Sequence, residues 1–143
     1  MSTSTTLNAP FRADIVGSFL RPQTVKDARA AYAAGTLDDA GLKAVEDEAI
    51  RDLVAKQKAA GLQVITDGEF RRSYWHLDFM WGLNGVERRT SRTGYMFHDE
   101  ETTADTAVVT GPISGENHPF VAHFKFVKAL EGEGQVARQT IPA

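Results

Sequence analysis

The amphipathic segment from Asp38 to Ala60 is the feature that most constrains how this chain folds. Its apolar residues recur at helical spacing on one face, namely Leu42, Val45, Ala49, Leu53 and Val54. Asp38 is a suitable N-cap, and Gly61 is a suitable stop after the last turn. Residues 62–66 (LQVIT) follow directly and have the composition of a buried strand. A long helix that leads into a strand through one glycine predicts a parallel βαβ crossover, and therefore an α/β fold.

The rest of the chain continues this alternation of strands and helices. Residues 13–19 (ADIVGSF) form a short apolar run ending near Gly-Ser, which predicts a buried strand. A helical pattern runs from Pro22 through Ala34 and is followed by Gly35 as a stop. A later helix starts at residues 118–119, and its apolar face consists of Phe120, Val121, Phe124 and Val127. Residues 135–141 predict a third core strand.

The polar face of the helix over residues 38–60 carries two pairs of opposite charges. Asp47 stands four residues before Arg51, and Asp52 stands four residues before Lys56. The acid comes first in both pairs, which is the better order for the helix dipole. The spacing therefore predicts two surface ion pairs.

The alternation of strands and helices stops in the middle of the chain. Glycines at 82, 85 and 94 break up this region, and residues 106–110 (TAVVT) predict a strand. We expect residues 85–110 to form an antiparallel excursion from the parallel core. Residues 1–11 are rich in Ser and Thr and are expected to be a disordered tail without signal-peptide character. Residues 12–143 are then expected to form one domain.

Composition excludes several classes of protein. The net charge of −3 leaves no strongly basic patch, so nucleic acid is not an expected partner. No apolar run approaches the roughly 20 residues of a membrane helix. The chain has no cysteine, which excludes disulfides, a cysteine nucleophile and a thiolate zinc site within it. The absence of cysteine suits a cytoplasmic protein.

Polar residues stand at two predicted strand ends, and these ends meet at one edge of a parallel sheet. Gly17 lets a ligand approach the backbone, and Ser18 adds a hydroxyl; the alternative is a simple turn glycine. Residues 67–72 (DGEFRR) hold two acids and two arginines. There Glu69 can face an ammonium group, and an arginine can face an anion. The alternative is a surface ion-pair cluster.

Other titratable residues carry weaker signals. In residues 75–79 (WHLDF), His76 and Asp78 are candidates for a proton-transfer pair or part of a metal site. The alternative is a packed segment in which His76 makes one hydrogen bond. His118 precedes a proline at a helix start and is expected to cap that helix rather than bind a ligand.

These motifs resemble the cobalamin-independent methionine synthase family, in particular its short single-barrel members. Residues 13–22 (ADIVGSFLRP) are similar to the opening of the catalytic barrel. Residues 61–73 (GLQVITDGEFRRS) resemble the second strand and its acidic turn, and 75–79 resemble the continuation in the short proteins. Residues 118–126 and 140–142 also look like family segments. The resemblance implies the N-terminal portion of a TIM-type (β/α)8 barrel, which is incomplete in these 143 residues because such a barrel needs roughly 250.

The resemblance also implies a reaction and a binding site. In the family, a methyl group moves from methyltetrahydrofolate, as a polyglutamate, to homocysteine, which becomes methionine. The family's backbone turn that binds the homocysteine carboxylate corresponds to residues 16–18, so Gly17 and Ser18 are the expected counterparts. Glu69 corresponds to the glutamate that binds the ammonium group. Asp67, Arg72 and His76 are weaker candidates for substrate binding, and no residue is assigned as catalytic.

The family's zinc ion, which lowers the pKa of the thiol, has His and Cys ligands in the later half of the barrel. We therefore expect no metal ligands in this chain and interpret it as a fragment or a shortened gene product. An open parallel sheet favours homo-oligomers or domain swapping. Two alternatives remain open at this stage. One is a zinc-dependent thiol alkyltransferase that acts on an epoxide, like a coenzyme M transferase, and the other is a non-catalytic binding or oligomerisation module.

Overall fold

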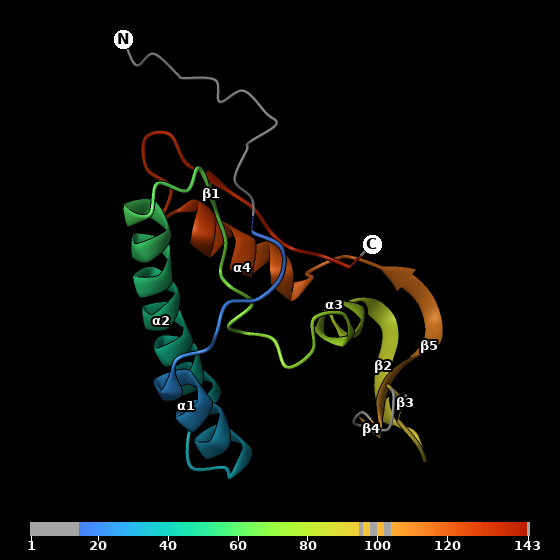
Figure 1. Ribbon diagram of the computed structural model, residues 1–143. Helices are drawn as coiled ribbons and strands as arrows, with labels where there is room; N and C mark the ends of the chain where they lie inside the picture. Colours follow the sequence, from blue (N-terminus) through green and yellow to red (C-terminus); the bar gives the residue numbers. More distant parts are fainter. Residues whose placement is uncertain (1–14, 95, 98–99, 102–103, 143) are drawn as a thin grey trace. The chain divides into compact units, whose positions relative to one another are not determined.

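The computed structural model describes residues 15–94, 96–97, 100–101 and 104–142, which adopt an α/β fold (Figure 1). The chain divides into two compact units. The first comprises the residues up to 72 together with 122–140, and the second comprises residues 73–121 and those after 140. The expected tail at residues 1–11 lies outside the described residues. A single partial-barrel domain over residues 12–143 stays a prediction.

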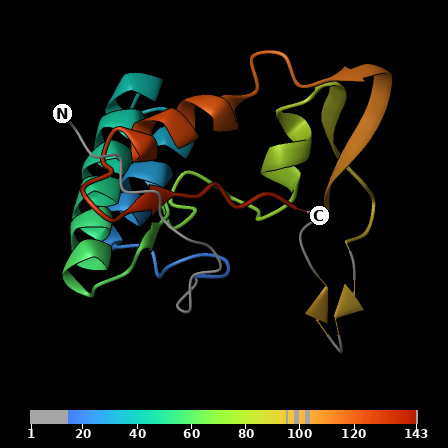
Figure 2. The ribbon, with the colours of Figure 1, turned by 90° about the horizontal axis from the view of Figure 1, so that it is seen from above.

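The first unit is built on two helices. These are α1 (Gln23–Ala33) and α2 (Asp39–Ala59), which lie side by side (Figures 1 and 2). Pro22 is the N-cap of α1, and the Asp38 carboxylate caps α2 by accepting the Gly41 N–H at 2.8 Å. Both predicted helices and their stops are therefore confirmed, because capping and periodicity are local properties of the sequence.

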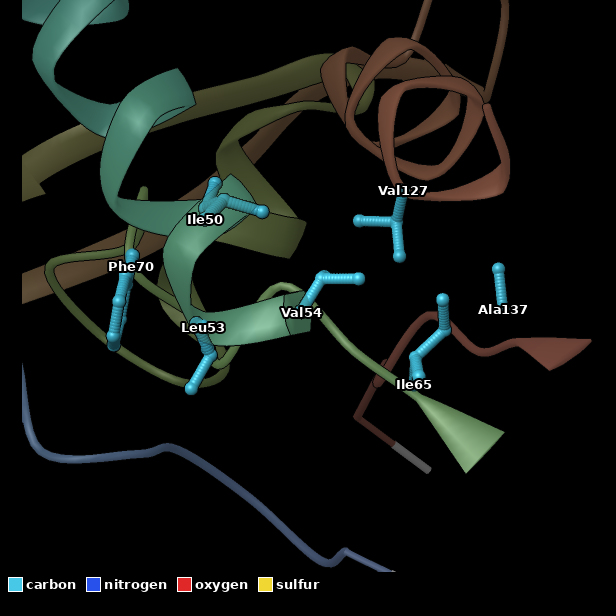
Figure 3. Packing of buried hydrophobic residues seen from close by; sticks show 7 residues of the cluster. All are labelled: Ile50, Leu53, Val54, Ile65, Phe70, Val127 and Ala137. Carbon is cyan, nitrogen blue, oxygen red and sulfur yellow. The ribbon is translucent and has the colours of Figure 1, made fainter. Parts of the chain in front are cut away.

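Two short parallel strands complete the first unit. β1 (Val64–Ile65) pairs with β6 (Val136–Ala137), and α4 (Pro119–Lys128) precedes β6 along the chain. These elements confirm the predicted strands over 62–66 and 135–141, although both are shorter than expected. The buried cluster between helices and strands consists of Ile50, Leu53, Val54, Ile65, Phe70, Val127 and Ala137 (Figure 3).

The strand expected over residues 13–19 is wrong for the described part, residues 15–19, which lie in no strand. Gly17 has a φ of +87°, and this turns the chain out of the extended conformation. The segment is held instead by a backbone hydrogen bond from Phe19 N–H to the Gly68 carbonyl at 3.2 Å. Phe19 also packs against the buried cluster. Phe19 thus contributes to the core without joining the sheet, while Val16 is 91% exposed, so the expected burial of this run is also wrong there.

The buried face of α2 differs from the predicted one. It includes Glu46, Asp47 and Gln57 beside the apolar residues, while Leu42 and Val45 are only half-buried. The predicted Asp47–Arg51 pair is wrong, because Asp47 pairs with Lys43 at 2.6 Å and with Arg71. The Asp52–Lys56 pair is confirmed at 2.6 Å. Arg71 comes from a distant part of the chain, so helical spacing alone could not indicate this partner.

The second unit contains the antiparallel excursion. Its main pairing joins β2 (Asn84–Thr90) with β5 (Asp105–Ser114) and runs from Val86↔Val109 to Thr90↔Asp105. This confirms the hairpin predicted for residues 85–110. At the start of α4 the His118 Nδ1 accepts the Phe120 N–H at 3.1 Å, which confirms the predicted cap. Val121, expected on the buried face of α4, is 51% exposed. The elements are α3 (Leu77–Trp81), β2 (Asn84–Thr90), β3 (Met96–Phe97), β4 (Glu100–Glu101) and β5 (Asp105–Ser114).

Among the helices formed by the described residues, none is long and apolar enough to cross a membrane.

A substitution at Gly85 tests the hairpin. Its φ is +76°, and an added Cβ would lie 2.3 Å from the Pro112 carbonyl oxygen. Gly85→Ala is expected to lower the free energy of unfolding by about 2 kcal/mol or more, because backbone atoms cannot move aside cheaply. Thermal unfolding followed by circular dichroism measures the effect. Gly115→Ala is the control, since a Cβ there meets no atom within 4 Å. Equal melting temperatures for the two variants would contradict this account of the chain at Gly85.

A second prediction concerns the edge of β6. Glu131 Oε1 accepts the Ala137 N–H at 2.7 Å, and Oε2 lies 3.1 Å from Lys128 Nζ. The backbone hydrogen bond, aided by Lys128, lowers the pKa of Glu131. A lowered carboxylate pKa stabilises the fold above the ordinary glutamate pKa, and this stability is lost as the pH falls through the lowered pKa.

Glu131→Gln is therefore expected to cost about 1 kcal/mol at about pH 7, and this cost should shrink as the pH falls through the lowered pKa of Glu131. Thermal unfolding in neutral and in strongly acid solution measures the difference from the unmodified chain. Glu133→Gln, in the same loop and exposed, is the control and should have little effect at either pH. A Glu131→Gln deficit that persists in acid would argue against the carboxylate–amide contact.

Candidate functional site

The turn that follows β1 is shaped by side chains of its own and of α2. Gln57 bonds to both backbone groups of Thr66, through Nε2 to the carbonyl at 2.9 Å and through Oε1 from the N–H at 3.0 Å. This removes Thr66 from the sheet, so β1 ends at Ile65. Asp67 Oδ1 then accepts the Glu69 N–H at 2.9 Å, which closes the turn. Gln57 and Asp67 are buried, so this geometry is protected from water.

Glu69 sits in this turn in an unusual conformation. Its φ is +58°, a left-handed value that costs a non-glycine residue on the order of 1 kcal/mol. The side chain is 7% exposed. Oε1 accepts the Thr140 hydroxyl at 2.8 Å and lies 3.4 Å from Arg72 Nη1. Oε2 makes no hydrogen bond to any residue that the structure describes, so this oxygen remains for a ligand.

The Gly17–Ser18 segment lies beside the same turn. The hydrogen bond from Phe19 N–H to the Gly68 carbonyl places residue 18 next to the residue that precedes Glu69. Ser18 is exposed, and a Cβ at Gly17 would meet no atom within 4 Å. The first unit thus brings together both stretches that the sequence singled out.

The weaker candidates have different roles. Asp67 uses a carboxylate oxygen inside the turn. Arg72 is buried, and it donates to the Thr140 carbonyl and, at 2.8 Å, to the Thr140 hydroxyl. His76 belongs to the second unit, where its ring lies 4.5 Å from that of Trp75. Asp78 accepts the N–H groups of Ser73 and Tyr74 at 2.9 and 2.8 Å and makes no hydrogen bond to His76.

Sequence reasoning missed two arginines that bind the backbone of the turn. Arg21 Nη2 donates to the carbonyls of Glu69 at 2.9 Å and Arg72 at 2.8 Å. Arg29 donates to the carbonyls of Phe70 at 2.7 Å and Arg72 at 3.0 Å. The proximity of Arg21 to Ser18 in the sequence was a usable signal, whereas Arg29 stands in a helix with no local sign of its role. Thr140 was also missed.

Two carboxylates of α2, Glu46 and Asp47, form ion pairs with Arg29 and Arg71. Glu46 accepts from Arg29 at 3.2 Å and from Arg71 at 3.3 Å. Burial raises the pKa of Glu46, and the two arginines offset that effect only in part. Burial also acts on Asp47, but hydrogen bonds from Lys43 and Arg71 outweigh it and lower the pKa of that carboxyl.

Metal binding does not fit this part of the chain. Over the described ranges, no three His, Cys, Asp or Glu side chains stand close enough together to hold a metal ion. The arrangement offers instead a buried carboxylate with one open oxygen, an exposed hydroxyl and a glycine backbone. Such a set can bind the ammonium and carboxylate groups of a small amino acid.

Comparison with known proteins gives a consistent family. A family model described as "Cobalamin-independent synthase, Catalytic domain" matches residues 11–134. The uncharacterized proteins YxjG and YxjH of Bacillus subtilis are each 44% identical over 94% of this chain. A 5-methyltetrahydropteroyltriglutamate–homocysteine methyltransferase of Nitrobacter winogradskyi is 27% identical over 93% of it. The chain spans 35% and 36% of the two Bacillus proteins and 17% of the Nitrobacter protein.

Two solved structures are also similar. A Listeria monocytogenes protein assigned as a vitamin-B12-independent methionine synthase has a TM-score of 0.77 and 43% identity, covering 96% of this chain and 38% of that one. A B12-independent methionine synthase from Shewanella sp. W3-18-1, in complex with selenomethionine, has a TM-score of 0.50 and 27% identity. That match covers 71% of this chain and 29% of the other.

A pair of arginine substitutions tests the buried charges behind the turn. Arg71 and Arg51 lie at 5.2 and 5.3 Å from the Phe126 ring, but Arg71 is 6% exposed and Arg51 is 50% exposed. Arg71→Met removes the buried cation that Glu46 and Asp47 share and leaves them only the more exposed Arg29 and Lys43, so it is expected to cost about 3 kcal/mol of unfolding free energy. Arg51→Met, the matched control, is expected to cost less than about 1 kcal/mol. Urea unfolding measures the free energy of unfolding of both variants. Equal losses would contradict a larger contribution from the buried Arg71 than from the exposed Arg51.

Proposed function

This chain belongs to the family of the cobalamin-independent synthase catalytic domain, and on that premise we propose that it carries the amino-acid site of a homocysteine methyltransferase. The proposed reaction moves a methyl group from a methylated folate to homocysteine. Named relatives with that activity support the homocysteine reaction rather than opening of an epoxide by a thiol. The parallel pair β1–β6 fits neighbouring strands in the N-terminal portion of a TIM-type barrel, with the site at their carboxyl ends.

The observation that carries the proposal is the environment of Glu69. One carboxylate oxygen is held by Thr140 and lies near Arg72, while the other makes no hydrogen bond to a described residue. A ligand ammonium that reaches this oxygen forms a charge-assisted hydrogen bond, worth roughly 1.5–3 kcal/mol at a buried site. Because the side chain is already fixed, little conformational entropy is lost on binding.

The second half of the proposed site is the Gly17–Ser18 segment. An α-amino acid places its carboxylate on the same carbon as its ammonium, so the two groups need adjacent partners. The Ser18 hydroxyl and the open backbone at Gly17 are the available partners beside the turn. The selenomethionine complex of the Shewanella relative supports a ligand with this amino-acid end. Arg72 and Asp67 shape the turn around Glu69, and His76 remains a weaker candidate.

The proposal assigns binding and orientation to the described residues and no chemical step. The resemblance to the family implies a zinc ion that would activate the thiol, but the described residues do not fit as its ligands. Methyl transfer and recognition of the folate are therefore proposals for a whole protein of the relatives' length. What these residues supply is a fixed carboxylate that orients the amino-acid end of the thiol substrate.

Ligand binding tests the role of Glu69. L-methionine and its desamino analogue, 4-(methylthio)butanoate, are titrated into the chain and into Glu69→Gln by isothermal calorimetry. The unmodified chain is expected to prefer L-methionine, and Glu69→Gln to lose about tenfold or more of that preference, because a neutral amide binds ammonium weakly. Glu48→Gln, on the same unit with its side chain 80% exposed, is the control. An unmodified chain without any preference for the amine would refute the assignment.

A further inference from the structure

Arg21 is not among the residues proposed to bind the ligand, yet its side chain binds the backbone carbonyl of Glu69. We propose that Arg21 is the positioning residue of the amino-acid site. Its hydrogen bonds fix where the Glu69 carboxylate lies relative to the Gly17–Ser18 segment. This inference rests on the proposed function and adds a residue to which neither the motifs nor the comparisons assign a role.

The first step of the argument concerns the conformation of Glu69. A left-handed φ at a residue with a Cβ persists only where surrounding groups hold it. Arg21 Nη2 donates to the Glu69 carbonyl at 2.9 Å and to the Arg72 carbonyl at 2.8 Å, so one charged group bridges both ends of the turn. Hydrogen bonds from a guanidinium are stronger than those between neutral groups. Without Arg21 the turn can relax and carry the carboxylate away from its present direction.

The second step concerns the other half of the site. Residues 17–21 form one short segment, and it contacts the turn twice. Phe19 binds the Gly68 carbonyl through its N–H, and Arg21 binds the Glu69 and Arg72 carbonyls through its side chain. The two contacts hold this segment and the turn against each other. A change at residue 21 therefore alters the spacing between the expected carboxylate partners and Glu69.

Arg29 provides a comparison within the same turn. It shares the Arg72 carbonyl with Arg21, but it also binds the Phe70 carbonyl and Glu46 on α2. Among the described residues, Arg21 and not Arg29 donates a hydrogen bond to the Glu69 carbonyl. Arg29 thus ties the turn to the helices, while Arg21 ties Glu69 to the Gly17–Ser18 segment. Loss of Arg29 should weaken the fold more than it weakens recognition of the amine.

The test measures amine preference, which a merely structural role would not change. L-methionine and 4-(methylthio)butanoate are titrated into the unmodified chain, Arg21→Met, Arg29→Met, Glu69→Gln and the double variant Arg21→Met/Glu69→Gln. Arg21→Met is expected to reduce the preference for the amine at least fivefold, and Arg29→Met to keep it within twofold while lowering the melting temperature. The double variant should lose no more than Glu69→Gln alone, because Arg21 acts through Glu69.

The outcomes separate the two proposals. If Glu69→Gln itself keeps the preference, the proposed function fails. If Glu69→Gln loses it while a folded Arg21→Met keeps it, or if the losses add in the double variant, the positioning role of Arg21 is overturned. Should Arg21→Met unfold, Arg21→Gln keeps a polar side chain, but its amide ends where Nε stands in arginine and falls short of the two carbonyls that Nη2 binds. An unchanged preference in that folded variant overturns the role equally.

Discussion

The turn over residues 69–72 depends on arginine side chains because its backbone is buried and takes part in no sheet. A buried carbonyl without a partner costs free energy comparable to a lost hydrogen bond. Arg21 and Arg29 supply donors to three of the four carbonyls, those of Glu69, Phe70 and Arg72. The turn can therefore leave the sheet at Thr66 and hold a left-handed residue without exposing its backbone to water.

Bringing several arginines under the surface requires carboxylates close by. Glu46 and Asp47 on α2 balance Arg29 and Arg71, and Glu69 lies near Arg72. Burial alone would favour neutral Glu46, which explains why its pKa is raised even with two arginines in contact. The charged side chains of α2 and of the turn therefore depend on one another, and α2 helps to determine where the Glu69 carboxylate lies.

Local signals made most of the fold predictable, whereas long-range polar contacts did not. Helix ends such as Asp38 followed from capping chemistry, and the hairpin followed from glycine spacing and a β-branched run. The strand expected at residues 13–19 failed because the left-handed φ of Gly17 outweighs the apolar pattern. The motif pointed to Glu69 and the Gly17–Ser18 segment. It could not point to Arg29, Thr140 or Arg71, the distant partner of Asp47, since these contacts join segments far apart in the sequence.

The described contacts that fix Glu69 all lie within the first unit. Thr140, Arg72, Arg21 and Asp67 each belong to it, and so does the Gly17–Ser18 segment. The described contacts that position the Glu69 carboxylate thus involve no residue of the second unit. Within the described ranges, no three His, Cys, Asp or Glu side chains stand close enough together to hold a metal ion. Under the proposed function, binding of the amino-acid end and activation of the sulfur are therefore separate tasks, and the preformed Glu69 carboxylate belongs to binding.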